Sequence, residues 1–319
     1  MKAFRVVDFD KPATFCNIPR EQPKDGQVEV KIDACGLNFA DLLMQKNQYQ
    51  DTPNVPFTLG MEIAGEISAI GPNTQSPEVG SRVTVFAGQG GLAEYGYFPA
   101  ERLIKIPDSM PSEVAAGFQV AYGTSHIALT HCARLKKNDT LLVLGAAGGV
   151  GLTAVELGKY FGAQVIAAAR GQEKLNIAKR FGADVLIDTN KENLRDVVKS
   201  LGGADVVYDP IGGDLFKEAV RACKPEGKIL TIGFASGDIP VIAANYLLVK
   251  NLSVIGLNWG AYLKFNPKVI SSSVRELTKL YTDKILTPQI SHIFPFSETN
   301  AALECIKNRK SIGKVVVKI

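Results

Sequence analysis

The sequence of 319 residues contains few of the residues that crosslink chains or bind metals. Its five cysteines are odd in number, lie far apart and never form a CxxC pair. This pattern argues against a disulfide framework and a thiolate metal cluster, and it fits a reducing compartment. The three histidines show no metal-ligand spacing. The cysteines are Cys16, Cys35, Cys132, Cys223 and Cys305.

Long hydrophobic runs and clusters of one charge are also missing. The longest uncharged stretch, residues 140–155, is too short and too rich in glycine for a membrane-spanning helix. The net charge of +4 comes from Lys and Arg spread along the chain, so we expect no surface for nucleic acids or anionic membranes. Since the chain opens with a strand-like segment and not with a targeting leader, we expect a soluble, cytoplasmic protein.

The chain does contain ample material for two folded domains. Its length favours two domains over one, and the 46% hydrophobic share excludes a disordered chain. The first third is predicted to be β-rich, because apolar and polar residues alternate over residues 28–34, which is the pattern of a strand with one buried face. Two further strands are expected at Glu62–Ile70 and Arg82–Phe86.

From about Lys137 the pattern changes to short apolar strands that alternate with helices. Such strands imply a parallel sheet covered on both faces, and six of them match a doubly wound, dinucleotide-binding (Rossmann) fold. The expected strands are Leu141–Leu144, Gln164–Ala169, Asp184–Ile187, Asp205–Tyr208, Lys228–Ile232 and Leu252–Leu257. The apolar run at residues 314–319 is assigned to a last strand of the first domain. We therefore predict an α/β protein in which residues 1–118 and 260–319 form one domain, with a nucleotide-binding domain of residues 119–259 inserted.

The strongest local signal is the glycine-rich segment at residues 145–151, which follows a predicted strand and opens a predicted helix. This is the context that the dinucleotide-binding fingerprint GxGxxG requires, with Ala146 at its first glycine position. Gly148 would let the backbone approach a pyrophosphate, and Gly151 would allow close packing of the helix on the strand. The loop residues expected to bind the cofactor are Ala147, Gly148, Gly149, Val150 and Gly151.

The end of the next strand predicts which cofactor binds. An NAD site carries Asp or Glu about 20 residues after the loop, where the carboxylate bonds the ribose 2′-hydroxyl. Here the strand ends at Arg170, and Lys174 follows one helical turn later. Two cations would attract the 2′-phosphate that a carboxylate would repel, so Arg170 and Lys174 favour NADPH. The alternative is a solvated arginine on a loop.

Five motifs resemble those of the zinc-independent quinone oxidoreductases of the medium-chain dehydrogenase/reductase superfamily, and in particular their quinone oxidoreductase-like protein 2 branch. They span essentially the whole chain and are Ala34–Asp41 (ACGLNFAD), Pro56–Gly65 (PFTLGMEIAG), Ala146–Gly151 (AAGGVG), Asp209–Gly213 (DPIGG) and Gly313–Val317 (GKVVV). The resemblance implies a GroES-like catalytic domain and a cofactor in the cleft between the domains. It also implies a homodimer joined through edge strands of the nucleotide-binding domains.

The same resemblance bears on metal binding. Zinc-dependent relatives place a cysteine where this chain has Asn38 and a histidine where it has Met61. An amide is a poor zinc ligand, and a thioether is too weak to replace imidazole. The four-cysteine lobe that carries structural zinc in those relatives is absent from the sequence as well, so we expect no metal.

Reduction of a quinone or an activated double bond needs hydride and hydrogen-bond donors to the developing oxyanion, but no Lewis acid. The donors that we expect are Tyr49 and Asn38, which occupies the position of the lost metal ligand. The spacing Asn38-x-x-Asp41…Tyr49 also resembles 2-enoyl thioester reductases, in which the tyrosine is a proton donor. The alternative for Tyr49 is an exposed loop tyrosine. Asp41 and Glu62 are interpreted as structural hydrogen-bonding residues.

Other site residues follow from the resemblance alone. Tyr122 matches a residue beside the nicotinamide or is a packed core tyrosine, and Gly233 and Phe234 are expected to pass close to the nicotinamide ring and ribose. Arg309 falls where bacterial relatives have an arginine near the adenosine. Trp259, the single tryptophan, would line the substrate cleft or support the dimer interface.

These residues together predict an NADPH-dependent, metal-free reductase of quinones or α,β-unsaturated carbonyl compounds, which acts on a small molecule. Two alternatives stay open. One is a 2-enoyl-thioester (enoyl-CoA) reductase, and the other is an NADPH-binding sensor with negligible turnover.

Overall fold

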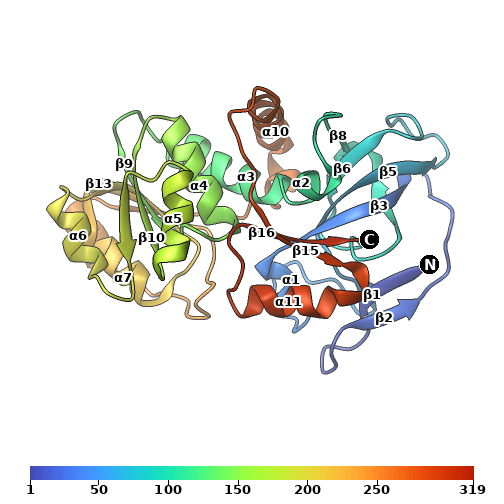
Figure 1. Cartoon of the computed structure of the whole chain (residues 1–319), viewed down its shortest axis with the longest axis horizontal. Coiled ribbons are helices and arrows are strands. Elements are labelled where there is room, and N and C mark those ends of the chain that lie inside the picture. The colour runs from blue at the N-terminus through green and yellow to red at the C-terminus, as the bar shows by residue number, and fades with distance from the viewer. The chain divides into compact units, whose positions relative to one another are not determined.

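The computed structural model describes all 319 residues, and tertiary contacts divide the chain into two units (Figure 1). Unit 1 consists of Met1–Val120 and Thr278–Ile319, and unit 2 consists of Ala121–Leu277. The chain therefore passes from unit 1 to unit 2 inside α3 (Gln119–His126) and returns inside α10 (Pro267–Thr282).

The return to unit 1 differs from the boundary that the sequence suggests at residue 260. Residues 260–277 belong to unit 2, because their side chains pack on α3 and on the π-helical turn that follows it, η2 (Ile127–Cys132). The Tyr262 hydroxyl lies 3.6 Å from Cys132 Sγ, and Glu276 Oε2 lies 3.3 Å from His126 Nε2. Hydrophobic patterning could not assign residues 260–277 to unit 2, because the pattern does not indicate which neighbouring element a helix packs against.

Unit 1 is built on β3 (Gln27–Leu37), which contains the alternating segment 28–34 and pairs antiparallel with β5, β7 and β16. Its seven-stranded sheet consists of β3, β5 (Glu62–Ile70), β6 (Arg82–Phe86), β7 (Tyr95–Pro99), β8 (Ile104–Lys105), β15 (Ile290–Pro295) and β16 (Lys314–Lys318). A smaller sheet consists of β1 (Lys2–Val6), β2 (Thr14–Asn17) and β4 (Phe57–Thr58). The helical elements are α1 (Phe39–Met44), η1 (Ala100–Arg102), α2 (Ser112–Ala116), η3 (Phe296–Glu298) and α11 (Thr299–Lys307). The first and last parts of the chain thus share one sheet.

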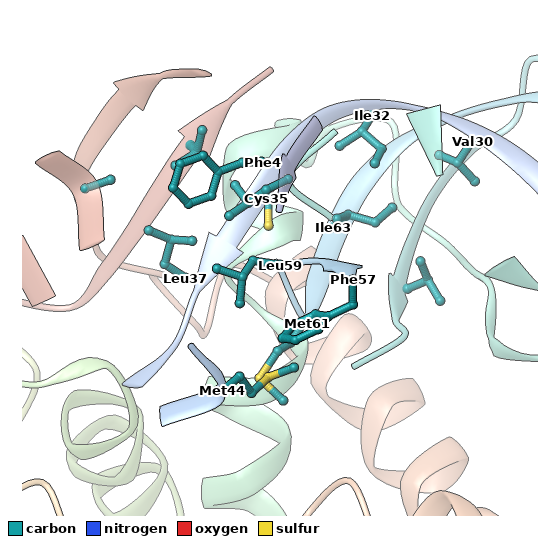
Figure 2. Packing of buried hydrophobic residues seen from close by; sticks show 14 of the residues in the cluster. Phe4, Val30, Ile32, Cys35, Leu37, Met44, Phe57, Leu59, Met61 and Ile63 are labelled. Atoms are coloured by element: carbon teal, nitrogen blue, oxygen red, sulfur yellow. The ribbon is translucent and has the colours of Figure 1, made fainter. Parts of the chain in front are cut away.

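One hydrophobic cluster forms the core of unit 1. Figure 2 shows part of it, including Phe4, Cys35, Leu59 and Met61, all of which are buried. Each fully buried apolar side chain contributes about 1.5–3 kcal/mol through the hydrophobic effect. This core holds β3 and β5 in place. Two polar residues of unit 1 described below lie at the ends of these strands, because Asn38 follows β3 and Glu62 is the first residue of β5.

Unit 2 contains a six-stranded parallel sheet in the order β11-β10-β9-β12-β13-β14. Numbered along the chain, this is the 3-2-1-4-5-6 order of a doubly wound fold, so the predicted fold class is confirmed. The strands are β9 (Thr140–Leu144), β10 (Gln164–Ala169), β11 (Val185–Asp188), β12 (Ala204–Asp209), β13 (Cys223–Thr231) and β14 (Ser253–Gly256). The helices are α4 (Gly149–Tyr160), α5 (Gln172–Arg180), α6 (Leu194–Ser200), α7 (Gly213–Ala222), α8 (Ala244–Lys250) and α9 (Tyr262–Phe265).

Ligands of doubly wound folds bind at the carboxyl ends of the strands, near the point where the strand order reverses. In unit 2 this point lies between β9 and β12, which are neighbours in the sheet. The loops that follow β9, β10, β12 and β13 therefore lie at the edge of the sheet where such folds bind their ligands.

No helix of the chain has the length and apolar character needed to cross a membrane.

Candidate functional site

The glycine-rich segment joins β9 to α4 by a tight turn. β9 ends at Leu144, and Gly148 is the N-cap of α4. A Cβ atom on Gly151 would lie 2.2 Å from the backbone oxygen of Gly145. Only glycine at position 151 therefore lets the first turn of α4 approach the end of β9 this closely.

The same turn leaves room for an anionic group. A Cβ atom on Gly148 would meet one atom within 4 Å, the Gly145 backbone oxygen at 3.3 Å. The N–H groups in the first turn of an α-helix have no partner within the helix, and the helix dipole favours negative charge at this end. The residues predicted from the sequence to bind the pyrophosphate lie at this end of α4, and the N–H of one of them, Gly148, donates to the Gly145 oxygen at 2.9 Å. They are Ala147, Gly148, Gly149, Val150 and Gly151.

A buried cluster of hydroxyl groups supports this turn, and no motif in the sequence marks it. Ser125 Oγ donates to the Val150 backbone oxygen at 2.9 Å. The same atom lies 2.7 Å from Thr153 Oγ1 and 2.9 Å from the Tyr208 hydroxyl. Because the cluster joins α3, α4 and β12, it fixes the first turn of α4 relative to the sheet.

The turn after β10 carries Arg170, which is exposed, and Lys174 lies in the first turn of α5. Asp188 at the end of β11 holds this turn, because its Oδ1 accepts a hydrogen bond from the Gly171 N–H at 3.0 Å. The N–H groups of Gly171 and Asn190 hold the pKa of Asp188 below its usual value, so this carboxylate is charged at neutral pH. Asp188 Oδ1 accepts hydrogen bonds from the N–H groups of Gly171 and Asn190, whereas the Arg170 side chain is exposed to solvent.

The loop that carries Gly233 and Phe234 follows β13 and lies against the loop after β12. The Ala235 N–H donates to the Pro210 backbone oxygen at 3.0 Å. Gly233 and Phe234 therefore lie at the carboxyl edge of the sheet, where a doubly wound fold binds its nucleotide.

Tyr122 and Trp259 are both buried in unit 2. The Tyr122 hydroxyl donates to Glu156 Oε2 at 2.5 Å, and burial together with this carboxylate raises the pKa of Tyr122 well above its usual value. The Trp259 indole lies against α3, where a Cβ atom on Gly123 would come within 2.6 Å of Nε1. The Tyr122 hydroxyl proton is therefore engaged inside the protein, as in a packed core tyrosine.

In unit 1, polar side chains meet where β3 ends and where β5 and β16 begin. Asn38 follows β3, and its Nδ2 donates to Glu62 Oε1 at 3.0 Å while its Oδ1 accepts from Lys314 Nζ at 2.9 Å. Lys314 Nζ also donates to Glu62 Oε1 at 2.6 Å and to the Leu37 backbone oxygen at 2.9 Å. The exposed fraction is 0% for the Glu62 side chain and 8% for that of Lys314. This ion pair is therefore removed from water.

Asp41 fixes the same segment from its other side. Its Oδ2 accepts from the Asn38 N–H at 2.8 Å, and its Oδ1 accepts from the Gly60 N–H at 3.3 Å. Burial raises the pKa of Asp41 to about 7, although both N–H groups act to lower it. Asp41 and Glu62 thus make the structural hydrogen bonds expected of them, and Glu62 is in addition the counter-ion of Lys314.

Two further predicted residues of unit 1, Tyr49 and Arg309, lie in other surroundings, as does Met61, which stands where zinc-dependent relatives have a histidine. Met61 is buried in the core cluster (Figure 2), and the Tyr49 ring packs against the same cluster. Burial raises the pKa of Tyr49, so its hydroxyl keeps its proton at neutral pH. Arg309 lies in the turn between α11 and β16 with a left-handed φ of 56°. No group of three or more His, Cys, Asp or Glu side chains is placed to hold a metal ion.

Comparisons with known proteins agree with the fold of the two units. Two family models match the chain, "Alcohol dehydrogenase GroES-like domain" over residues 24–108 and "Zinc-binding dehydrogenase" over residues 149–279. A relative, quinone oxidoreductase-like protein 2 homolog of Nematostella vectensis, is 43% identical over 297 residues, which are 91% of this chain and 81% of the relative.

Two solved structures are similar over the full length of both chains. One is a mycobacterial protein complexed with NADPH, with a TM-score of 0.93 and 28% identity. The other is the quinone oxidoreductase of Thermus thermophilus, solved also as its complex with NADPH, with a TM-score of 0.88 and 29% identity. The chain belongs to the quinone oxidoreductase-like protein 2 family, among the zinc-independent members of the medium-chain dehydrogenase/reductase superfamily.

Proposed function

We propose that this protein reduces quinones or α,β-unsaturated carbonyl compounds with NADPH and without a metal ion. The observation that carries the proposal lies in unit 2. An open helix N-terminus at Gly148 is combined there with a solvent-facing cation, Arg170, at the strand end where an NAD site has a carboxylate. The relatives named quinone oxidoreductase and the two NADPH complexes support it.

The nucleotide would be held by unit 2. The backbone N–H groups of Ala147, Gly149, Val150 and Gly151 would bind the pyrophosphate, while the Gly148 N–H donates to the Gly145 oxygen at 2.9 Å. Arg170 and Lys174 would bind the 2′-phosphate. Gly233 and Phe234 would lie beside the nicotinamide and its ribose. When bound, NADPH would supply the hydride for the reduction.

Unit 1 would supply the groups that act on the acceptor. Asn38 has an Nδ2 proton whose nearest further acceptor is the Gly36 backbone oxygen at 3.5 Å, a long contact that a better acceptor can replace. The Asn38 amide would therefore donate to the oxygen that becomes negative as hydride reaches the acceptor. Tyr49, whose hydroxyl stays protonated at neutral pH, would deliver the proton.

The proposal is tested by NADPH oxidation with three acceptors in parallel, an ortho-quinone, a short 2-alkenal and a 2-enoyl-CoA. We expect turnover with the quinone or the alkenal, and a higher kcat/KM with NADPH than with NADH. The variant Arg170→Glu should reverse this preference, because a hydrogen bond to a charged group is worth about 1.5–3 kcal/mol, or a factor of roughly 10 to 150.

Other outcomes would assign other functions. Turnover with the enoyl-CoA alone would identify a 2-enoyl-thioester reductase. If none of the three acceptors supports NADPH oxidation but calorimetry shows tight NADPH binding, the proposed reductase activity would be refuted and the protein would be an NADPH-binding sensor. An unchanged NADPH-to-NADH ratio in Arg170→Glu would refute the 2′-phosphate assignment.

A homodimer is part of the proposal, and the surface of unit 2 supports it. β14 is an edge strand of the six-stranded sheet, and the segment that leads into it exposes a group of apolar side chains. They are Ile239 (67% exposed), Val241 (89%), Leu248 (78%) and Val249 (78%). In sedimentation velocity we expect a dimer for the wild type and for Val79→Glu, an exposed control in unit 1, and a monomer for Leu248→Glu. A monomeric wild type would refute the dimer.

A further inference from the structure

The Lys314 ammonium is a buried charge that the proposed function leaves unused. All three of its protons are engaged, because Nζ donates to Glu62 Oε1 at 2.6 Å, to the Leu37 backbone oxygen at 2.9 Å and to Asn38 Oδ1 at 2.9 Å. The ammonium therefore has no proton left for a substrate, and any effect on chemistry must pass through the groups that it holds.

Among those groups, the Asn38 side chain is the one that is not fully buried. Its orientation is fixed twice, since its backbone N–H donates to Asp41 Oδ2 and its side-chain oxygen is turned toward Lys314. A planar amide with its oxygen fixed also has its Nδ2 protons fixed. One of these donates to Glu62 Oε1 at 3.0 Å, and the other has the 3.5 Å contact to the Gly36 oxygen.

The ammonium also makes this amide a stronger donor. A cation bonded to a carbonyl oxygen draws electron density away from the amide nitrogen, and hydrogen bonds in a chain strengthen one another. In a buried site of low effective dielectric this polarisation is screened less than in water. The effect is largest when the acceptor of the second proton carries negative charge, because such bonds are about twice as strong as neutral ones.

We infer that Lys314 is a positioning residue for the reduction, which orients and polarises the Asn38 amide so that its second Nδ2 proton is donated to the acceptor oxygen. This inference rests on the proposed function. As hydride adds to the acceptor carbon, negative charge develops on that oxygen, and the long contact to Gly36 is exchanged for a charge-assisted hydrogen bond. A lysine that only neutralised Glu62 would have no such link to Asn38.

The first test compares three variants. Lys314→Met/Glu62→Gln removes both charges, so that neither is left buried alone, and Lys314→Arg keeps a cation. Asp205→Asn/Lys224→Met is the control, because it removes an ion pair of 2.7 Å from unit 2. With a quinone, we expect kcat to fall about 10- to 100-fold in the first variant. The kcat should largely persist in Lys314→Arg and in the control variant. The NADPH Kd of all three variants should stay within about twofold of the wild-type value.

A double-mutant cycle separates positioning from a merely structural role. Asn38→Ala should lower kcat to a similar extent, and adding Lys314→Met/Glu62→Gln to it should cause no further loss, because the charge would act through the amide. Losses in kcat that multiply, or an unchanged kcat in Lys314→Met/Glu62→Gln, would overturn the inference.

A second readout decides the case if the wild type turns over no acceptor, an outcome that would refute the proposed function itself. The Asn38 side-chain amide signal in a ¹⁵N-labelled sample can be identified by its loss in Asn38→Ala. We expect this signal to lie downfield of solvated amides in the wild type and in Lys314→Arg, and to move toward them in Lys314→Met/Glu62→Gln. A signal that does not move would overturn the inference without reference to activity.

Discussion

Replacement of Glu62 by Gln should lower the free energy of unfolding by about 3–5 kcal/mol, because it leaves the Lys314 ammonium buried without its counter-ion. Glu62 accepts three hydrogen bonds, from Lys314 Nζ, from Asn38 Nδ2 and, at 3.1 Å, from the Val120 N–H. A second substitution, Lys314→Met, should recover most of the loss, since a neutral pair no longer buries an unpaired charge.

Urea unfolding measures this effect, and the single tryptophan helps to locate it. Trp259 lies in unit 2, so its fluorescence follows unit 2, whereas far-UV circular dichroism follows both units. The Glu62→Gln midpoint should move in the circular dichroism trace more than in the fluorescence trace. The control is Glu304→Gln, which breaks an exposed pair with Lys307 and should cost less than about 1 kcal/mol. Equal midpoints for Glu62→Gln and Glu304→Gln would contradict the prediction.

Two alanine substitutions in the glycine-rich turn should have opposite consequences. Gly151→Ala places a methyl group 2.2 Å from the Gly145 oxygen, so α4 must move away from β9, at a cost of about 1–3 kcal/mol. Gly148→Ala meets only the Gly145 oxygen at 3.3 Å and has an ordinary φ of −76°, so the fold should tolerate it. Its methyl group would instead occupy the space of the pyrophosphate.

We therefore expect Gly148→Ala to keep the thermal unfolding midpoint of the wild type and to raise the NADPH Kd by at least about 10-fold, the equivalent of 1.4 kcal/mol. Gly151→Ala should lower the unfolding midpoint of unit 2 by several degrees, at roughly 2–4 °C per kcal/mol for a domain of about 150–250 residues. Differential scanning fluorimetry and calorimetry measure the two quantities. If Gly148→Ala binds NADPH with the Kd of the wild type, the glycine-rich turn is not part of the cofactor site.

The parts of the fold that follow from local pattern were predictable from the sequence. The bounds of β5 and β6 agree with the expected strands, because runs of strand-forming residues bounded by Gly, Pro and Asn identify a strand. β13 begins at Cys223, whereas the sequence predicts a start at Lys228. The prediction is late because Pro225 and Gly227, which lie in the first part of the strand, locally indicate a turn. The pairing of Ala204 with Cys223 extends the strand in spite of that signal.

The polar cluster of unit 1 was predictable only in part. Asn38 and its position at the end of β3 follow from a motif within one segment. Lys314 does not, because its partners Glu62 and Asn38 lie 252 and 276 positions away in the chain. A lone lysine at the start of an apolar strand is also typical of a solvated strand end. Only the pairing of β16 with β3 shows that this lysine is buried.

The shared sheet of unit 1 also affects how the protein is made. During synthesis unit 2 is one continuous segment and can fold soon after it leaves the ribosome, whereas unit 1 waits for β16. Between Val120 and Lys314 the ribosome adds roughly 190 residues, which takes about 10–40 s at 5–20 residues per second. Over that interval Glu62 has no lysine to pair with and must stay hydrated. The synthesis of β16 is thus the event that allows unit 1 to close its core.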